Sequence, residues 1–168
     1  MSDKYRPTAF ADVKGAATKI QSVDWWTPPS VFEKLDIEFD IDVASPIGGV
    51  EWIPAKKYYT KEDDGLSKDW HGTVWMNPPY GKFTAEWLEK FVKHGDGIAL
   101  VFSRTDTRWF HNYALNADAL LFTKGRLAFI NPERSDTTTS ASGSLFVACG
   151  EKSVKALEQS KLGWFIRL

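Results

Sequence analysis

The chain has 168 residues, of which 43% are hydrophobic and 26% are charged, as in ordinary folded globular proteins and unlike disordered ones. Its 21 Lys and Arg residues nearly balance 22 Asp and Glu residues, for a net charge of −1. This excludes a globally cationic protein, so any contact with nucleic acid must come from a local basic patch. The single cysteine, Cys149, excludes an internal disulfide framework and a cysteine-based zinc site, and its apolar neighbours indicate a buried, inert thiol. There is no long apolar run and no signal-peptide core, so we expect a cytoplasmic protein with no membrane partner.

The first part of the chain predicts an N-terminal arm, a helix and a strand. Residues 1–23 are polar with several small residues, and we expect a partly ordered arm there. Thr27 followed by Pro28 predicts a helix start, with Thr27 as N-cap and Pro28 at the first helical position. Apolar residues at helical spacing extend this helix to Leu35, and alternation of polar and apolar residues predicts a strand over residues 38–43.

The rest of the chain predicts alternating strands and helices. In chain order we expect a short strand (57–60), an acidic turn (62–66), a strand (73–76), an amphipathic helix capped by its first threonine (84–93) and a buried parallel strand (97–102). A helix (107–116), two strands (119–122 and 126–130) and a polar loop (131–143) follow. The chain then continues with a strand (144–149), a short helix (153–159) and a last strand (164–166). This order predicts one α/β domain over residues 24–168, with a mostly parallel sheet and an antiparallel edge.

The most informative motif is Asn77-Pro78-Pro79-Tyr80, which follows a short β-type run. Open α/β sheets bind their ligands at the carboxyl ends of their strands, which is the position of this motif. The Asn77 side-chain carbonyl and the Pro78 main-chain carbonyl can each accept an N–H bond from an exocyclic amine, and the two prolines hold these carbonyls rigidly. Tyr80 would stack on the base once it has left its duplex. The motif predicts methylation of an amino group on a base; the alternative is an ordinary Pro-Pro turn.

Other candidate residues are less specific. Trp25 and Trp26 lie in a polar segment, where aromatic side chains either bind a flat ligand such as adenine or pack in the core. The three histidines, His71, His94 and His111, lack the spacing of metal ligands, and we expect no metal site.

Several local motifs also follow one another in a specific order. They are Thr27-Pro28-Pro29, residues 39–44, Asp64-Gly65-Leu66 with Trp70, Asn77-Pro78-Pro79-Tyr80, and residues 104–111. In this order, from about Asp24 to Cys149, the chain resembles the phage-type, Dam-like DNA N6-adenine methyltransferases. The resemblance implies a Rossmann-like fold, S-adenosylmethionine as cofactor, double-stranded DNA as partner, methyl transfer to the N6 amine of adenine, and the cytoplasm of the host cell as the location of a bacteriophage enzyme.

The resemblance further implies which residues contact the cofactor. Thr27 and Pro28 would line its methionine end, Asp42 and Ala44 would lie near its amino group, and Asp64 would accept from its adenine amine. The complete expected set is Trp26, Thr27, Pro28, Asp42, Ala44, Asp64 and Asn77. The first cofactor loop departs from a G-x-G pattern and offers only Gly48-Gly49.

For the DNA, the resemblance implies contacts from Tyr80, Arg104, Asp106 and Arg108 to the target base or its phosphates. Capping of the next helix is the alternative for Asp106, and surface charge is the alternative for the two arginines. Residues 125–127 with the strand from Ser144 would match a late hairpin of the family.

Two other functions remain open from the sequence. Asn-Pro-Pro-Tyr chemistry also serves RNA-base and protein-glutamine N-methyltransferases, and the nearly neutral net charge is compatible with both. A catalytically inactive nucleic-acid-binding module is the third possibility, because the glycine loop is atypical. Binding of S-adenosylmethionine separates this third possibility from the other two.

Overall fold

The computed structural model describes residues 25–131, 137–140 and 142–168. The predicted arm over residues 1–23 lies outside the described residues. The elements, in chain order, are α1 (Pro29–Leu35), β1 (Ile41–Asp42), β2 (Val74–Met76), α2 (Thr84–His94), β3 (Gly97–Phe102), α3 (Arg108–Asn112), the 3₁₀ helix η2 (Ala114–Asn116), β4 (Ala119–Thr123), β5 (Ala128–Ile130), β6 (Thr137–Thr139), β7 (Ser144–Cys149), α4 (Glu151–Gln159) and β8 (Gly163–Arg167).

The main sheet has six strands in the order β1-β2-β3-β7-β4-β8. β1 pairs with β2 and β2 with β3 in parallel, whereas β7 is antiparallel to both β3 and β4, and β8 is antiparallel to β4. It follows that β1, β2, β3 and β4 run in one direction and β7 and β8 in the other. The fold is therefore α/β, as predicted, but the sheet is mixed, because β7 lies inside it and not in a hairpin at its edge.

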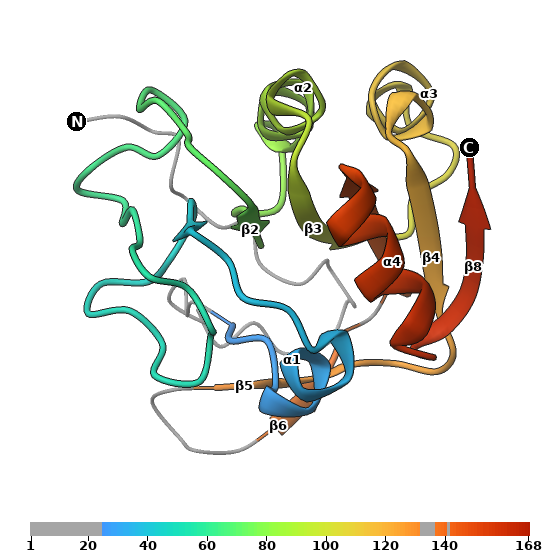
Figure 1. Ribbon diagram of the computed structural model, residues 1–168, viewed down its shortest axis with the longest axis horizontal. Helices are drawn as coiled ribbons and strands as arrows, with labels where there is room; N and C mark the ends of the chain where they lie inside the picture. Colours follow the sequence, from blue (N-terminus) through green and yellow to red (C-terminus); the bar gives the residue numbers. More distant parts are fainter. Residues whose placement is uncertain (1–24, 132–136, 141) are drawn as a thin grey trace, which may run out of the picture.

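Helices cover both faces of this sheet (Figure 1). α2 and α3 lie on one face, where Trp87, Leu88 and Phe91 of α2 pack with Val74 and Met76 of β2. α1 and α4 lie on the other face. Trp75 points to that side and contacts Phe32, Phe39 and Phe146 through ring centroids 4.8, 5.6 and 6.5 Å apart. Alternation along β2 thus fills two separate cores, because successive side chains of a strand point to opposite faces.

A second, two-stranded antiparallel sheet forms from β5 and β6. Trp26 extends it through two backbone hydrogen bonds with Ile130, of 3.0 and 2.9 Å. β6 lies within the segment predicted to be a polar loop, because three consecutive β-branched threonines pair with β5. The predicted hairpin between residues 125–127 and the Ser144 strand is wrong, since the Ser144 strand, β7, pairs with β3 and β4.

Three predicted helix caps also differ from the structure. α1 begins at Pro29 with Pro28 as the extended N-cap residue (ψ 149°), and Thr27 makes no cap. Pro28 stays outside the helix because a residue that precedes a proline disfavours the α conformation. Phe83, not Thr84, is the N-cap of α2. α3 is capped by Thr107, whose hydroxyl accepts from the Phe110 N–H, and not by Asp106.

Two further features bear on the chemistry of the chain. Cys149 is buried in β7, and burial raises the pKa of its thiol to about 11, in keeping with the predicted inert cysteine. Within the described ranges, no helix is both long and apolar enough to cross a membrane.

Candidate active site

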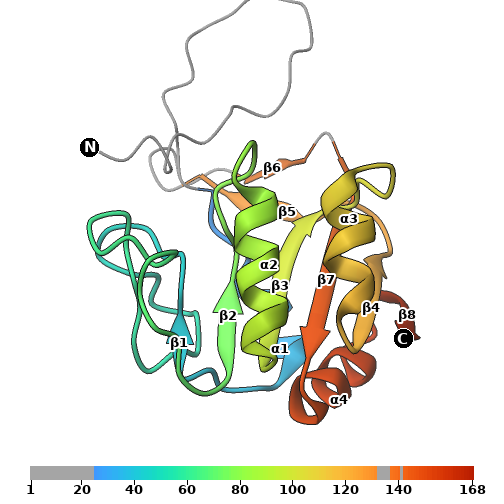
Figure 2. The same cartoon turned by 90° about the horizontal axis from the view of Figure 1, so that it is seen from above.

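The carboxyl ends of β1, β2 and β3 lie at one edge of the sheet because these strands are parallel neighbours. Asp42 ends β1, Asn77 follows β2 directly, and Phe102 ends β3. Figure 2 shows the β5–β6 ribbon at the end of the sheet toward which β2 and β3 point. Four segments that are far apart in the sequence therefore meet around the Asn-Pro-Pro-Tyr turn.

The Asn77 side chain is held at both ends of its amide. Its Nδ2 donates to the Thr27 hydroxyl at 3.2 Å, and its Oδ1 accepts from the Tyr80 hydroxyl at 2.7 Å. A carbonyl oxygen has two lone pairs, so Oδ1 keeps one acceptor position beyond the Tyr80 bond. Pro78 is buried and Pro79 half-buried, and their fixed φ angles restrict the turn. The sequence predicted the acceptor Asn77 but not its bond to Thr27.

Tyr80 is held by its ring and by its hydroxyl. Its ring stacks on Phe102 with centroids 4.0 Å apart and planes 25° from parallel. The hydroxyl also lies 3.4 Å from the Leu100 carbonyl oxygen. Burial raises the pKa of the Tyr80 hydroxyl, which therefore stays protonated and available as a donor at neutral pH.

Asp42 is a buried carboxylic acid, with 3% of its surface exposed. Its Oδ1 accepts from the Ala44 N–H at 3.1 Å. Burial raises the pKa of the Asp42 carboxyl to about 7, although the Ala44 N–H acts in the opposite direction. Asp42 therefore changes charge near neutral pH, a property that is common among functional carboxyl groups.

The Asp64 turn lies against the residue that follows Asp42. A Cβ atom at Gly65 would collide with the Val43 carbonyl oxygen, so the turn approaches β1 at a distance that only glycine permits. Asp64 itself has a positive φ of 55°. Its Oδ1 is buried and has no hydrogen-bond partner among the described residues. A buried acceptor without a donor is costly, and it marks a place where a ligand N–H would fit.

Lys90 of α2 anchors the segment that follows Asp64. Its ammonium group donates to the carbonyl oxygens of Leu66 at 2.8 Å and Gly65 at 3.4 Å, and also to that of Lys68. The same group lies 4.7 Å from the ring centroid of Trp70. Burial lowers the pKa of Lys90. Sequence reasoning missed this anchor, because nothing in the helical pattern distinguishes Lys90 from Lys93, the other lysine of α2.

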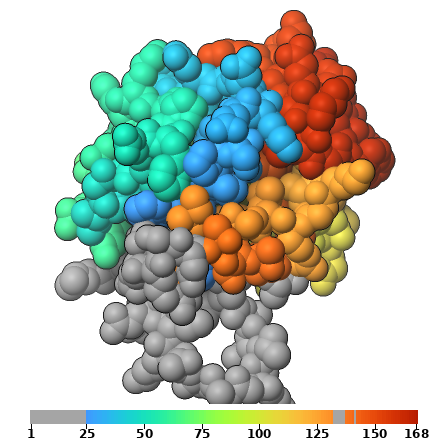
Figure 3. All heavy atoms as spheres, turned by 90° about the horizontal axis from the view of Figure 1, so that it is seen from below, coloured from blue at the N-terminus to red at the C-terminus, as the bar shows by residue number. Residues whose placement is uncertain are grey.

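The segment from Trp26 to Pro28 crosses the same region. The Thr27 carbonyl accepts from the Trp52 indole N–H at 2.9 Å, and the Trp26 and Trp52 rings meet edge to face at 5.5 Å. Figure 3 shows atoms of the first described residues, in blue, adjoining those of the β5–β6 region, in orange. Thr27 therefore lies between the β5–β6 sheet and Asn77.

The predicted DNA contacts follow β3. Arg104, Asp106 and Arg108 are exposed, and the Arg104 guanidinium lies 5.7 Å from the ring centroid of Phe102. Arg104 thus contacts the Phe102 ring that stacks on Tyr80. Asp106 lies in the turn that leads into α3, and Arg108 is the first residue of α3. Sequence reasoning missed Phe102. As the last residue of the strand next to β2, it could have been found from the order of the parallel strands.

The site is formed by carboxyl, amide, hydroxyl and aromatic groups. Among residues 25–131, 137–140 and 142–168, no cluster of three His, Cys, Asp or Glu side chains is arranged to hold a metal ion.

Comparison with known proteins identifies one family. A family model described as DNA N-6-adenine-methyltransferase (Dam) matches residues 15–156. Searches of curated proteins and of solved structures gave no significant match. The family match covers most of the chain, including every segment of the site described above. The chain therefore belongs to the Dam family of DNA N-6-adenine-methyltransferases.

Proposed function

We propose that this protein transfers a methyl group from S-adenosylmethionine to the N6 amine of adenine in double-stranded DNA, on a Rossmann-like domain. The observation that carries this proposal is the Asn77 carbonyl oxygen, fixed at the carboxyl end of β2 and next to the strand that ends in the buried Asp42. Family membership supports the activity, and this group of residues supports the site.

The residues around Asp42 and Asp64 fit the cofactor chemically. The unpartnered Asp64 Oδ1 suits an amine donor such as that of the cofactor's adenine, and the Asp42 carboxylate suits its ammonium group. Trp26, Thr27, Pro28 and Ala44 would line the space between Asp42 and Asn77. The bound cofactor would supply a methyl group already activated on a positively charged sulfur.

The Asn-Pro-Pro-Tyr turn would prepare the nitrogen that receives this methyl group. One N–H of the target amine would donate to the free lone pair of Asn77 Oδ1 and the other to the Pro78 carbonyl oxygen. Both acceptors stabilise the positive charge that develops on the nitrogen as it attacks the methyl group, so no proton has to leave the amine before the attack. Their positions are fixed before the substrate arrives, because Asn77 is bonded at both ends and Pro78 is rigid.

The target adenine would leave the duplex and stack on the Tyr80 ring, whose orientation Phe102 helps to fix. Arg104 and Arg108, both exposed at the end of β3 and the start of α3, would contact the DNA backbone. This arrangement places the positive charges locally, as a chain with a net charge of −1 requires.

A labelled-methyl assay tests the proposal directly. The protein is incubated with tritiated S-adenosylmethionine and, separately, duplex DNA, RNA and a protein mixture. We expect label only in duplex DNA, and N6-methyladenine after digestion to nucleosides. Label in RNA or protein instead would favour the other substrates of Asn-Pro-Pro-Tyr enzymes. A chain that binds DNA but gives no heat with S-adenosylmethionine in a calorimeter would be an inactive binding module.

A further inference from the structure

We propose that the Thr27 hydroxyl is a positioning group that holds the Asn77 amide in its catalytic orientation. The inference rests on the proposed function and gives Thr27 a task beyond lining the cofactor. Asn77 has two chemically opposite ends, an oxygen that accepts and an NH₂ group that donates. Only the oxygen can hold the target amine, so the orientation of the amide decides whether the site can act.

In the structure, the amide of Asn77 is held in the orientation that the reaction needs. Thr27 Oγ1 takes the Nδ2 end at 3.2 Å, and the Tyr80 hydroxyl takes the Oδ1 end at 2.7 Å. The oxygen is thereby directed toward Tyr80, on whose ring the base is proposed to stack. In the opposite orientation the NH₂ group would face the target amine, and two donors would meet without an acceptor.

Thr27 can serve as a fixed reference because the chain around it is held on three sides. Its side chain is buried, with 1% exposed, and its carbonyl accepts from the Trp52 indole N–H. Trp26, just before it, is hydrogen-bonded in both directions to Ile130 of β5. α1 begins at Pro29, just after it. Thr27, 50 positions before Asn77, therefore supplies a rigid partner for Nδ2, whereas the partner of Oδ1, Tyr80, belongs to the same turn as Asn77.

This bond also connects two parts of the proposed reaction. Residues 26–28 would border the methionine end of the cofactor, and Asn77 would hold the amine that receives its methyl group. The Thr27 hydroxyl therefore fixes the acceptor oxygen relative to the segment that borders the donor. Misplacement of reacting groups by about 1 Å can cost on the order of 100-fold in rate, so a single buried hydroxyl has a measurable kinetic effect.

The test compares Thr27→Val with Thr27→Ser. Valine keeps the shape of threonine and removes the hydroxyl, whereas serine keeps the hydroxyl and removes the methyl group. At saturating S-adenosylmethionine, we expect Thr27→Val to lose about tenfold or more in the single-turnover rate of duplex methylation. Thr27→Ser should stay within a few-fold of the unaltered protein. The dissociation constant for S-adenosylmethionine, from calorimetry, should change little in both variants.

Three results would overturn the inference while leaving the proposed function intact. They are an unchanged rate in Thr27→Val, an equal loss in Thr27→Ser, and a loss confined to cofactor affinity, which would make Thr27 a cofactor contact alone. A lack of methyl transfer by the unaltered protein would instead contradict the proposed function, and with it this inference.

A second measurement needs neither cofactor nor turnover. In nitrogen-15 NMR spectra of the unaltered protein, the side-chain NH₂ signals of Asn77 are assigned by their loss in Asn77→Ala. A bond to Thr27 should slow the exchange of one of these protons with water in the unaltered protein and in Thr27→Ser. Exchange as fast as that of the exposed Asn112 would overturn the inference even if Thr27→Val did not fold.

Discussion

The Tyr80 ring lies face to face with the Phe102 ring, with centroids 4.0 Å apart and planes 25° from parallel. Phe102 therefore covers one face of the Tyr80 ring. The Tyr80 hydroxyl is bonded to Asn77 at the same time. The orientation of the proposed stacking surface is thus set by two neighbouring strands, one of which carries the acceptor Asn77.

Tyr80→Phe should keep more methylation activity than Tyr80→Ala, because the ring and its contact with Phe102 remain although the hydroxyl bond to Asn77 is lost. Tyr80→Ala should lose a large part of it, since base–aromatic stacking contributes about 1–3 kcal/mol per base. Steady-state rates on duplex DNA measure both effects, and Tyr58→Ala, at a tyrosine 48% exposed on another loop, is the control. Equal activity in Tyr80→Ala and the control would exclude stacking by Tyr80.

Base flipping should be visible in binding experiments without turnover. Fluorescence of 2-aminopurine at the target position should rise on binding, because the base leaves the stack. A mismatched target should bind more tightly than a matched one, because less unpairing energy is needed. Equal affinities, with no fluorescence change at any position tested, would direct attention to RNA or protein as the substrate.

Asn77→Ala should reduce methyl transfer by about 100-fold or more, because it removes one of the two acceptors proposed to hold the amine. Folding and S-adenosylmethionine affinity should be largely retained. Asn112→Ala, at an exposed position on α3, is the matched control and should behave as the unaltered protein. Near-normal turnover in Asn77→Ala would contradict the assigned site.

Asp42 predicts a pH dependence of both stability and cofactor binding. The folded protein holds a proton on Asp42 up to a pKa of about 7, whereas the unfolded chain releases it near 3.8. The contribution of Asp42 to stability is therefore fully present below pH 3.8 and is lost as the pH rises through 7. Urea unfolding at pH 5 and pH 8 should show stability falling more in the unaltered protein than in Asp42→Asn.

The same carboxyl group should make cofactor binding stronger at higher pH. The positive amino group of S-adenosylmethionine would favour the ionised form of Asp42, so affinity should rise between pH 5 and pH 8. Asp42→Ala should bind the cofactor more weakly at pH 8, and Asp42→Asn should lose the pH dependence. Titration calorimetry at both pH values measures this, and unchanged affinity in Asp42→Ala would remove Asp42 from the cofactor site.

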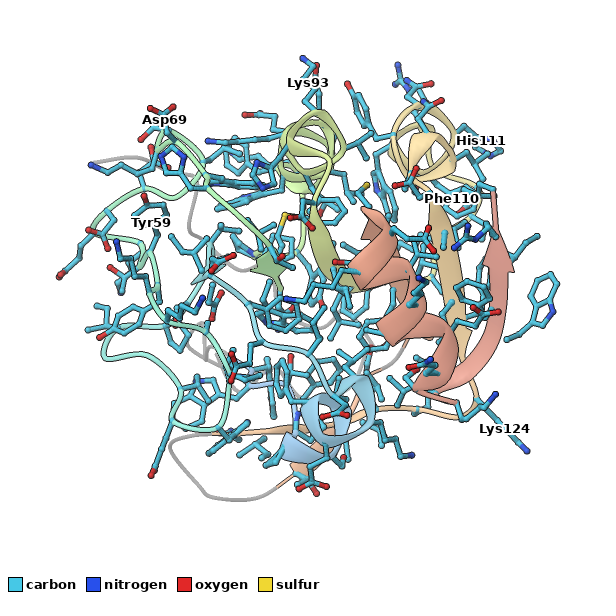
Figure 4. All side chains as sticks on the ribbon, in the orientation of Figure 1. Tyr59, Asp69, Lys93, Phe110, His111 and Lys124 are labelled. Carbon is cyan, nitrogen blue, oxygen red and sulfur yellow. The ribbon has the colours of Figure 1, made fainter. Side chains whose placement is uncertain are left out.

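Lys90→Met should destabilise the folded protein by about 1 kcal/mol or more, because carbonyl groups of the Asp64 segment lose their cationic donor. The methionine chain still covers part of Trp70. The control is Lys93→Met on the same helix: Lys93 points outward (Figure 4) and pairs with Glu89 at 2.7 Å with 73% of its side chain exposed, so about 0.5 kcal/mol or less should be lost. Equal losses in the two variants would show that Lys90 does not anchor the segment.

Sequence reasoning predicted best the elements whose own residues determine them. The predicted range 97–102 is the observed β3, because a continuous apolar run suits a strand buried on both faces. α2 was placed to within one residue at its carboxyl end, because its apolar face repeats at helical spacing. Asn77 and Asp42 were predicted at strand ends and lie there.

The structural features that could not be predicted from the sequence depend on contacts between residues that are distant in the chain. The strand predicted over 38–43 shortens to the two residues of β1, because Phe39, before β1, makes only an isolated bridge, to Ala55. The Thr27–Asn77 bond and the Tyr80–Phe102 stack depend on how segments meet at the sheet edge. Spacing along the chain carries no information about such contacts.

The position of β7 determines when this sheet can be completed. β4 and β8 join β1, β2 and β3 only through β7, which pairs with β3 on one side and β4 on the other. Gly97 pairs with Cys149, so the pairing of β3 with β7 closes a long loop. The chain loses the entropy of this loop before the contacts between the two strands can compensate for it. During synthesis β4 therefore has no strand of this sheet to pair with until β7 has left the ribosome.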